Sequence, residues 1–165
     1  MMALFSRLFA APELLLAAAD PGQAPGLAAL HAAVFRRGWS EPEFEALLVD
    51  RSVLAHAAHS GSSLAGFIIS RRAAVEAEIL SLAVAPTHRR RGLAGRLLDR
   101  HLRALAAAGV QTVVLEVDEA NTAARRLYAR RAFRPAGRRE GYYPDGAGAG
   151  ATALILRCDL KEPSA

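Results

Sequence analysis

The chain has few of the residues from which cross-links and metal centres are made. Cys158 is the only cysteine in 165 residues, so neither an internal disulfide nor a metal site built on several thiolates is possible. The five histidines do not show the spacing of a metal-binding motif such as H-E-x-x-H, and we assign no metal. A chain of this length buries about 70% of its unfolded surface, so we expect a packed core to stabilise it.

Long uncharged apolar runs are also missing. In the N-terminal stretch MMALFSRLFAAPELLL, Arg7, Pro12 and Glu13 interrupt each apolar run before it could span a bilayer. The charged start that is typical of a signal peptide is not present. We therefore expect a protein of the cytoplasm without a membrane partner.

Lysine is nearly absent as well, although the formal net charge is +5. Lys161 is the single lysine among 21 basic residues, and the rest are arginines. These arginines occur in several separate stretches, and only 6% of the residues are aromatic. A basic sheet surface that binds nucleic acid needs aromatic side chains among the charges, so we expect no direct binding to nucleic acid.

Apolar residues make up 52% of the chain, and their periodicity predicts a mixed α/β fold. We expect residues 1–165 to form a single domain, in which helices pack against a mixed sheet and one strand–helix–strand crossover occurs. The segments expected as strands are 14–18, 53–58, 64–71, 75–84, 112–117, 133–140 and 151–159. The segments expected as helices are 27–35, a short helix capped by Ser40 and Glu43, 92–108 and 122–131.

The junction LSLAVAPTHRRRGLAGRLL, at 80–98, predicts an anion-binding turn. An apolar strand ends at Pro86, and a basic turn with Gly92 leads into a helix. Backbone N–H groups, the positive end of the helix dipole and the arginine charges converge there. Gly92 and the small Ala94 allow the backbone to come close to a phosphate group.

Two polar side chains interrupt apolar segments further along. Glu116 lies at the end of the strand TVVLEV, where it is either a general base for an amine or a strand-end carboxylate in contact with water. Tyr128 follows Asn121 by seven residues, so both lie on the same side of a helix. Its phenol either faces a ligand or packs in the core, while Asn121 also suits the N-cap of that helix. The pattern alone leaves these alternatives open.

The spacing Arg89-x-x-Gly92-x-Ala94 after AVAP resembles the signature of the acyl-CoA-dependent GNAT N-acetyltransferases. The blocks RGWSEPEF, AEILSLAVAP, LEVDEANTAARRLYARRAF and RREGYYP are similar to those of the RimI-type ribosomal-protein N-terminal acetyltransferases, and together they span most of the chain. The resemblance implies a mostly antiparallel sheet that is split by a V-shaped acetyl-CoA cleft and has helices on both faces.

The resemblance also implies roles for individual residues. Glu116 would be the base and Tyr128 the acid in a direct transfer without a covalent enzyme intermediate. The main chain at Leu82, Ala83 and Val84 would hold the pantetheine arm of acetyl-CoA. The remaining residues implied to contact the cofactor are Arg89, Arg90, Arg91, Gly92, Leu93, Ala94, Gly95 and Asn121. Glu78 is an alternative base, because some GNAT enzymes carry theirs in the preceding strand.

The implied acceptor is the N-terminal alanine of a small-subunit ribosomal protein, and Trp39, Tyr142 and Tyr143 are candidates for lining its groove. Two alternatives remain: a GNAT enzyme for a small-molecule amine or a lysine, and a non-catalytic acyl-CoA-binding module. The chain departs from the family at Ala132, where glycine is usual. If this residue adopts a positive φ, the alanine costs roughly 1 kcal/mol.

Overall fold

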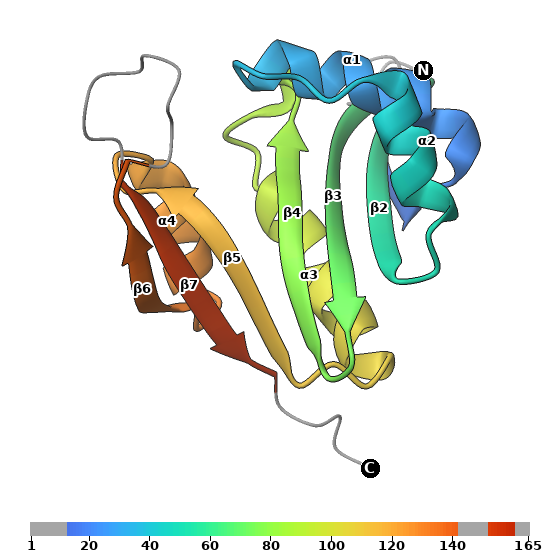
Figure 1. Cartoon of the computed structure of the whole chain (residues 1–165). Coiled ribbons are helices and arrows are strands. Elements are labelled where there is room, and N and C mark those ends of the chain that lie inside the picture. The colour runs from blue at the N-terminus through green and yellow to red at the C-terminus, as the bar shows by residue number, and fades with distance from the viewer. Residues whose placement is uncertain (1–12, 142–151, 161–165) are drawn as a thin grey trace, which may run out of the picture.

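The computed structural model describes residues 13–141 and 152–160, which form a seven-stranded sheet with helices on both faces (Figure 1). Its order is β1-β2-β3-β4-β5-β7-β6. The strands are β1 (Leu14–Ala18), β2 (Val53–Ser60), β3 (Ser63–Ala73), β4 (Glu76–Val84), β5 (Thr112–Asp118), β6 (Arg134–Arg139) and β7 (Ala153–Asp159). The helices are α1 (Ala24–Val34), α2 (Glu41–Val49), α3 (Leu93–Ala107) and α4 (Thr122–Ala129), with 3-10 turns at Pro21–Gln23 and Pro86–His88. The mixed α/β fold expected from the sequence is confirmed.

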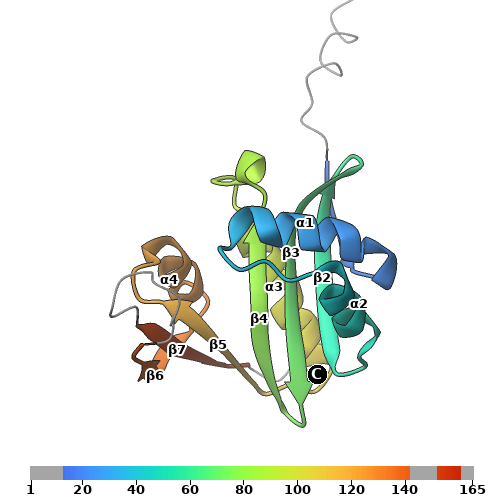
Figure 2. The same cartoon turned by 45° about the horizontal axis from the view of Figure 1, so that its top comes forward.

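The sheet divides between β4 and β5, its one parallel pair of neighbours. Pairing between these strands ends at Ile79 and Leu115, although both strands continue beyond that point. There β4 carries an extra residue, Leu80, because Ile69 and Ser70 of β3 pair with Ser81 and Ile79. A bulge of this kind bends a strand and interrupts its pairing. The strands diverge as a V (Figures 1 and 2).

Two apolar clusters lie on opposite faces of this sheet. Leu93, Leu97 and Leu98 of α3 pack with Tyr128 of α4 on one face. Leu27 of α1 packs with residues of α2 and β3 on the other. Figures 1 and 2 place α3 behind β2–β4, and α4 behind β5 and β7. Each side of the V therefore has a helix of its own on the α3/α4 face.

The structure corrects three local expectations. Helix α1 begins at Ala24, three residues before its expected start at 27, because Asp20 caps the preceding 3-10 turn and proline is tolerated in a first turn. Val75 lies in the β3–β4 turn and is 46% exposed, so it is not a strand residue. Helix α4 ends at Ala129, two residues before the end expected for it.

The almost wholly apolar sequence of β5 is typical of a strand covered on both faces, but the structure buries only one face of it. Val113, Leu115 and Val117 are buried against the α3/α4 side, whereas Val114 and Glu116 on the opposite side are only partly buried. In the described part of the chain, α1 and α2 cover β2–β4 and leave this face of β5 open (Figure 1). Because this face is open, the Glu116 side chain keeps 20% of its surface exposed.

Three buried polar side chains connect α3 to β2 and β3. Nδ1 of His56 lies 2.8 Å from Nδ1 of His101, and Nε2 of His101 lies 2.7 Å from the Ser70 hydroxyl oxygen. One proton must lie between the two imidazoles, which suits two neutral rings. Burial lowers the pKa of His101 to about 3, and burial followed by the charge of Arg100 lowers the pKa of His56. The network is therefore built for the uncharged histidines.

We expect this network to make stability depend on pH. The unfolded chain takes up a proton on His101 near pH 6.5, whereas the folded chain resists it down to about pH 3. Stability is therefore complete above pH 6.5 and falls as the pH is lowered towards 3. Between pH 7.5 and 5.0, wild type should lose about 2 kcal/mol more of its unfolding free energy than His101→Gln. Denaturant titrations measure this difference.

The matched control is His88→Gln, because His88 is only partly buried in the turn before α3 and does not belong to this network. Its pH dependence should equal that of the wild type. An equal loss in wild type and His101→Gln would show that this histidine is not the source of acid sensitivity.

Candidate active site

The turn between β4 and α3 has the features of an anion site. Gly92 is the N-cap of α3 with a φ of 74°, no side chain in the described residues caps the helix, and its first turn has no acidic residue. The first N–H groups of α3 are therefore available to a ligand. Arg90 also has a positive φ, of 62°, which costs a residue with a side chain about 1–2 kcal/mol. Backbone strain at this turn is consistent with a binding role.

The predicted arginines surround this turn. Arg89, Arg90 and Arg91 are all exposed. The guanidinium of Arg89 donates to the carbonyl oxygen of Val84 at 3.3 Å, so the side chain folds back over the end of β4. A Cβ added at Gly92 would meet no atom within 4 Å. The glycine thus serves backbone conformation and leaves the space above the turn open.

Leu82, Ala83 and Val84 lie in β4 beyond the last residue that pairs with β5. All three still pair with β3 on the other side of the strand. The main-chain groups that face the split therefore have no strand opposite them, as at the edge of a sheet. Such groups can hold an extended ligand by hydrogen bonds.

Glu116 lies immediately after the last β5 residue that pairs with β4. Its Oε1 lies 3.1 Å from Nη2 of Arg139, while Oε2 is buried without a hydrogen-bond partner in the described residues. The side chain is 20% exposed and projects to the face opposite Leu115. One oxygen is held and the other is free to accept a proton.

The alternative base, Glu78, has a different position. It is exposed and lies opposite Val114, within the paired part of β4 and β5. Glu116 is therefore nearer to where the strands separate.

Tyr128 and Asn121 come from one helix, as expected. The Asn121 side chain accepts a hydrogen bond from the N–H of Ala124 at 3.1 Å and caps α4. Tyr128 is 7% exposed, and its ring packs edge-on against Phe133 at 5.5 Å. Burial raises the pKa of this phenol to about 12, so it keeps its proton at neutral pH. Tyr128 therefore packs in the core, and its protonated phenol is also compatible with a role as proton donor.

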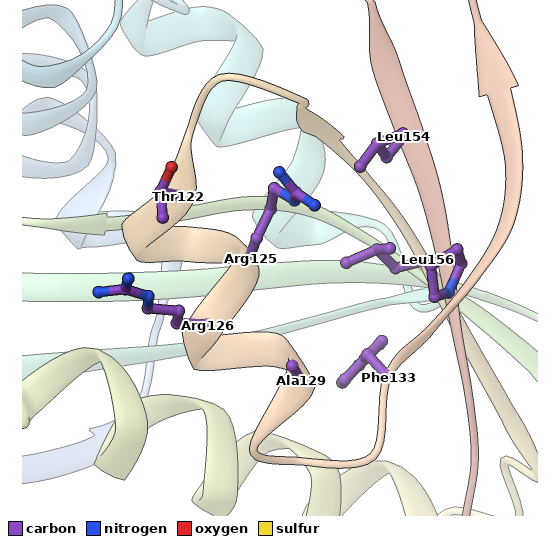
Figure 3. Close-up of a pocket in the computed structure, with 8 residues that line it drawn as sticks. Thr122, Arg125, Arg126, Ala129, Phe133, Leu154 and Leu156 are labelled. Carbon is purple, nitrogen blue, oxygen red and sulfur yellow. The ribbon is translucent and has the colours of Figure 1, made fainter.

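Of the three aromatic residues expected to line the acceptor groove, the structure describes only Trp39. The Trp39 ring stacks on His31 at a ring distance of 4.6 Å, and the backbone N–H of Trp39 donates to Nδ1 of His31 at 3.0 Å, so Trp39 has a structural role. Tyr142 and Tyr143 lie outside the described residues. A hollow of about 320 Å³ between α4 and β6–β7 includes Phe133 and Leu156, and contains none of the predicted site residues (Figure 3).

Sequence reasoning missed two residues beside the split. The hydroxyl of Ser81 is buried in β4 and has no hydrogen-bond partner in the described residues. A polar residue inside the apolar run LSLAV is a signal that could have found it. Arg139 had no such signal, because its contact with Glu116 depends on the register of β6, β7 and β5.

Across residues 13–141 and 152–160, no cluster of three or more His, Cys, Asp or Glu side chains could hold a metal ion. No helix within those ranges has both the length and the apolar character to cross a bilayer.

Comparisons with known proteins agree with this geometry. The model of the Acetyltransferase (GNAT) family matches residues 24–133. The chain therefore belongs to the GNAT acetyltransferase family. It is 34% identical over 99 residues to the ribosomal protein bS18-alanine N-acetyltransferase of Haemophilus influenzae, which covers 60% of this chain and 67% of that protein.

Solved structures show the same fold. The crystal structure of the ribosomal-protein-S18-alanine N-acetyltransferase from Escherichia coli has a TM-score of 0.84 and 26% identity, covering 92% of this chain and 97% of that one. Arabidopsis thaliana NAA60 in complex with acetyl-CoA has a TM-score of 0.78 at 21% identity, covering 90% of this chain and 99% of that one.

The end of α4 gives a stability prediction. Ala132, the residue that replaces the usual glycine, has a φ of 63°, which is the positive φ considered from the sequence. Ala132→Gly should raise the free energy of unfolding by about 1 kcal/mol, because glycine adopts this conformation without strain. Ala129→Gly, inside α4, should lower it by about 1 kcal/mol. If denaturant unfolding shows both variants losing stability, the strain assigned to Ala132 is absent.

Proposed function

We propose that this protein transfers an acetyl group from acetyl-CoA to the N-terminal α-amino group of a ribosomal protein, with alanine as the first residue. One observation carries the proposal: the split between β4 and β5 has a cationic turn beside one strand and the free oxygen of Glu116 on the other. The names of the Haemophilus and Escherichia relatives support this acceptor.

The residues present suit acetyl-CoA. Uncapped N–H groups of α3 and the exposed Arg89–Arg91 segment match the charge of a pyrophosphate, with Gly92, Leu93, Ala94 and Gly95 forming the entrance to the helix. The free main-chain groups at 82–84 match the amides of a pantetheine arm, and Asn121 stands at the start of α4. When bound, acetyl-CoA supplies the acetyl group as a thioester.

Glu116 and Tyr128 would then move the two protons of the reaction. Oε2 of Glu116 accepts a proton from the attacking amine, through a water molecule, as the nitrogen forms its bond to the carbonyl carbon. The Tyr128 phenol, whose pKa of about 12 keeps it protonated at neutral pH, donates its proton to sulfur as the carbon–sulfur bond breaks. N–H groups at 82–84 stabilise the charge on the carbonyl oxygen. No covalent enzyme intermediate is required.

The acceptor follows from proton affinity. An α-amino group has a pKa of about 7.7–8.0 and a lysine about 10.4, so deprotonating the α-amino group is easier by roughly 3.5 kcal/mol. A single carboxylate base is better matched to that group. The open face of β5 gives the chain terminus of another protein room to approach Glu116. We place this activity in a single domain in the cytoplasm, with no nucleic acid in direct contact.

Kinetics with three acceptors test this function. A peptide with a free N-terminal alanine should have a kcat/KM at least about tenfold above that of the same peptide with a blocked N-terminus and an internal lysine, or of a small amine, because of the lower α-amino pKa. A smaller preference would favour the alternative of a lysine or small-molecule acetyltransferase. Mass spectra of ribosomal proteins from cells with and without the enzyme would identify the natural acceptor.

Glu116→Gln distinguishes an enzyme from a binding module. We expect kcat to fall by about 10²–10⁴ while the Kd for acetyl-CoA stays within twofold. Glu119→Gln is the matched control, because Glu119 pairs with Arg138 at 3.1 Å much as Glu116 pairs with Arg139. Full activity in Glu116→Gln would transfer the role of base to Glu78.

The anion site has its own test in the two glycines that flank α3. Gly92 and Gly109 have φ values of 74° and 85°, and an added Cβ at either meets no atom within 4 Å. Each change to alanine should cost about 1 kcal/mol of stability. Gly92→Ala alone should raise the Kd for acetyl-CoA, by about tenfold, since it shifts the N–H groups of the turn. Calorimetry showing equal Kd values would place the pyrophosphate elsewhere.

A further inference from the structure

The two sides of the V, β1–β4 and β5–β7, are joined by only a short stretch of strand pairing. Strands β4 and β5 pair through Glu76–Ile79 and Thr112–Leu115 only. Helix α3 contacts β2, β3 and β4, while α4 lies behind β5 and β7 (Figures 1 and 2). Tyr128 belongs to the second side, whereas the anion-binding turn belongs to the first. The apolar cluster that α3 and α4 share holds the two helices together, but apolar packing is non-directional and a polar contact is needed to fix their relative orientation.

An ion pair joins these two helices. Nε of Arg131 donates to Oδ1 of Asp99 at 2.7 Å, and Nη2 donates to Oδ2 at 3.1 Å. Asp99 lies in α3, and Arg131 follows α4. The Arg131 side chain is 20% exposed and that of Asp99 is 43% exposed. Two parallel charged hydrogen bonds fix orientation as well as distance.

Gly95 provides the space for this contact. A Cβ at Gly95 would overlap Nη2 of Arg131 and lie 3.2 Å from its Cζ. The guanidinium therefore lies against the backbone of the first turn of α3, next to the anion-binding turn. The glycine predicted to contact the cofactor thus also has a packing role.

Arg131 is equally connected to the helix that carries Tyr128. Its Nη1 donates to the carbonyl oxygen of Leu127 at 3.2 Å, and its backbone N–H donates to the carbonyl oxygen of Tyr128 at 2.9 Å. The Cys158 thiol of β7 donates to the carbonyl oxygen of Arg131 at 3.4 Å. One residue therefore contacts α3, the end of α4 and β7.

We propose that Arg131, with Asp99 and Gly95, is a positioning residue that holds Tyr128 at its working distance across the split. The inference rests on the proposed function of Tyr128 as proton donor. Arg131 does not touch the reacting atoms and acts through the helix end to which it is bonded. Its loss lets α4 move relative to α3, which lowers the rate of the chemical step more than it weakens acetyl-CoA binding.

A double-mutant cycle tests this coupling. Arg131→Met should lower kcat by about tenfold in the wild type and by less than twofold in Tyr128→Phe, because the misplaced phenol is already gone. Asp99→Asn, which keeps the size of the side chain, should reproduce the effect in part. Thermal melts and the Kd for acetyl-CoA confirm that each variant is folded and binds.

Arg130→Met is the matched control, since Arg130 is the adjacent, exposed arginine, and its kcat should stay within twofold of wild type. If Arg131→Met lowers kcat equally in both backgrounds, or in neither, the positioning role is refuted while the proposed function stands. If Tyr128→Phe has full activity, the acid role of Tyr128 fails and the positioning role fails with it.

Discussion

The end of hydrogen bonding between β4 and β5 is the constraint on which the rest of the structure depends. Parallel neighbours in a sheet ordinarily stay paired along their length, but here the extra residue Leu80 turns β4 away after Ile79. The free main-chain groups of β4, the turn with Gly92 and the carboxylate of Glu116, which together form the proposed ligand site, all lie beside this separation. A continuous sheet with the same residues would have no split to bind a thioester.

The separation has an energetic cost that the two apolar clusters must offset. Beside the split, Ser81 Oγ and Glu116 Oε2 are buried without partners in the described residues, and each such atom costs about 1–3 kcal/mol. Arg90 adds backbone strain at the turn. The leucines of α3, packed on the sheet behind the split, contribute about 1.5–3 kcal/mol each. The unpartnered polar atoms and the backbone strain therefore both lie beside the proposed ligand site.

Local sequence patterns predicted what depends on neighbours in the chain. The capping box of Ser40 and Glu43, the Gly92 start of α3 and the Asn121 cap of α4 are all present. Contacts between distant segments could not be predicted in this way. The pairing of Glu116 with Arg139, and of Asp99 with Arg131, depends on strand register and helix packing. The open face of β5 escaped prediction because an apolar run does not reveal which elements will cover it.

The space left by Gly95 has a consequence for how this chain can change over time. The guanidinium of Arg131 occupies the volume that a Cβ at position 95 would need. A substitution of Gly95 by a larger residue is therefore tolerated only after Arg131 has been replaced by a shorter one. The reverse order passes through a crowded intermediate. The two positions, 36 residues apart in numbering, are therefore expected to covary among descendants of this sequence, with Asp99 losing its selective value once the arginine is gone.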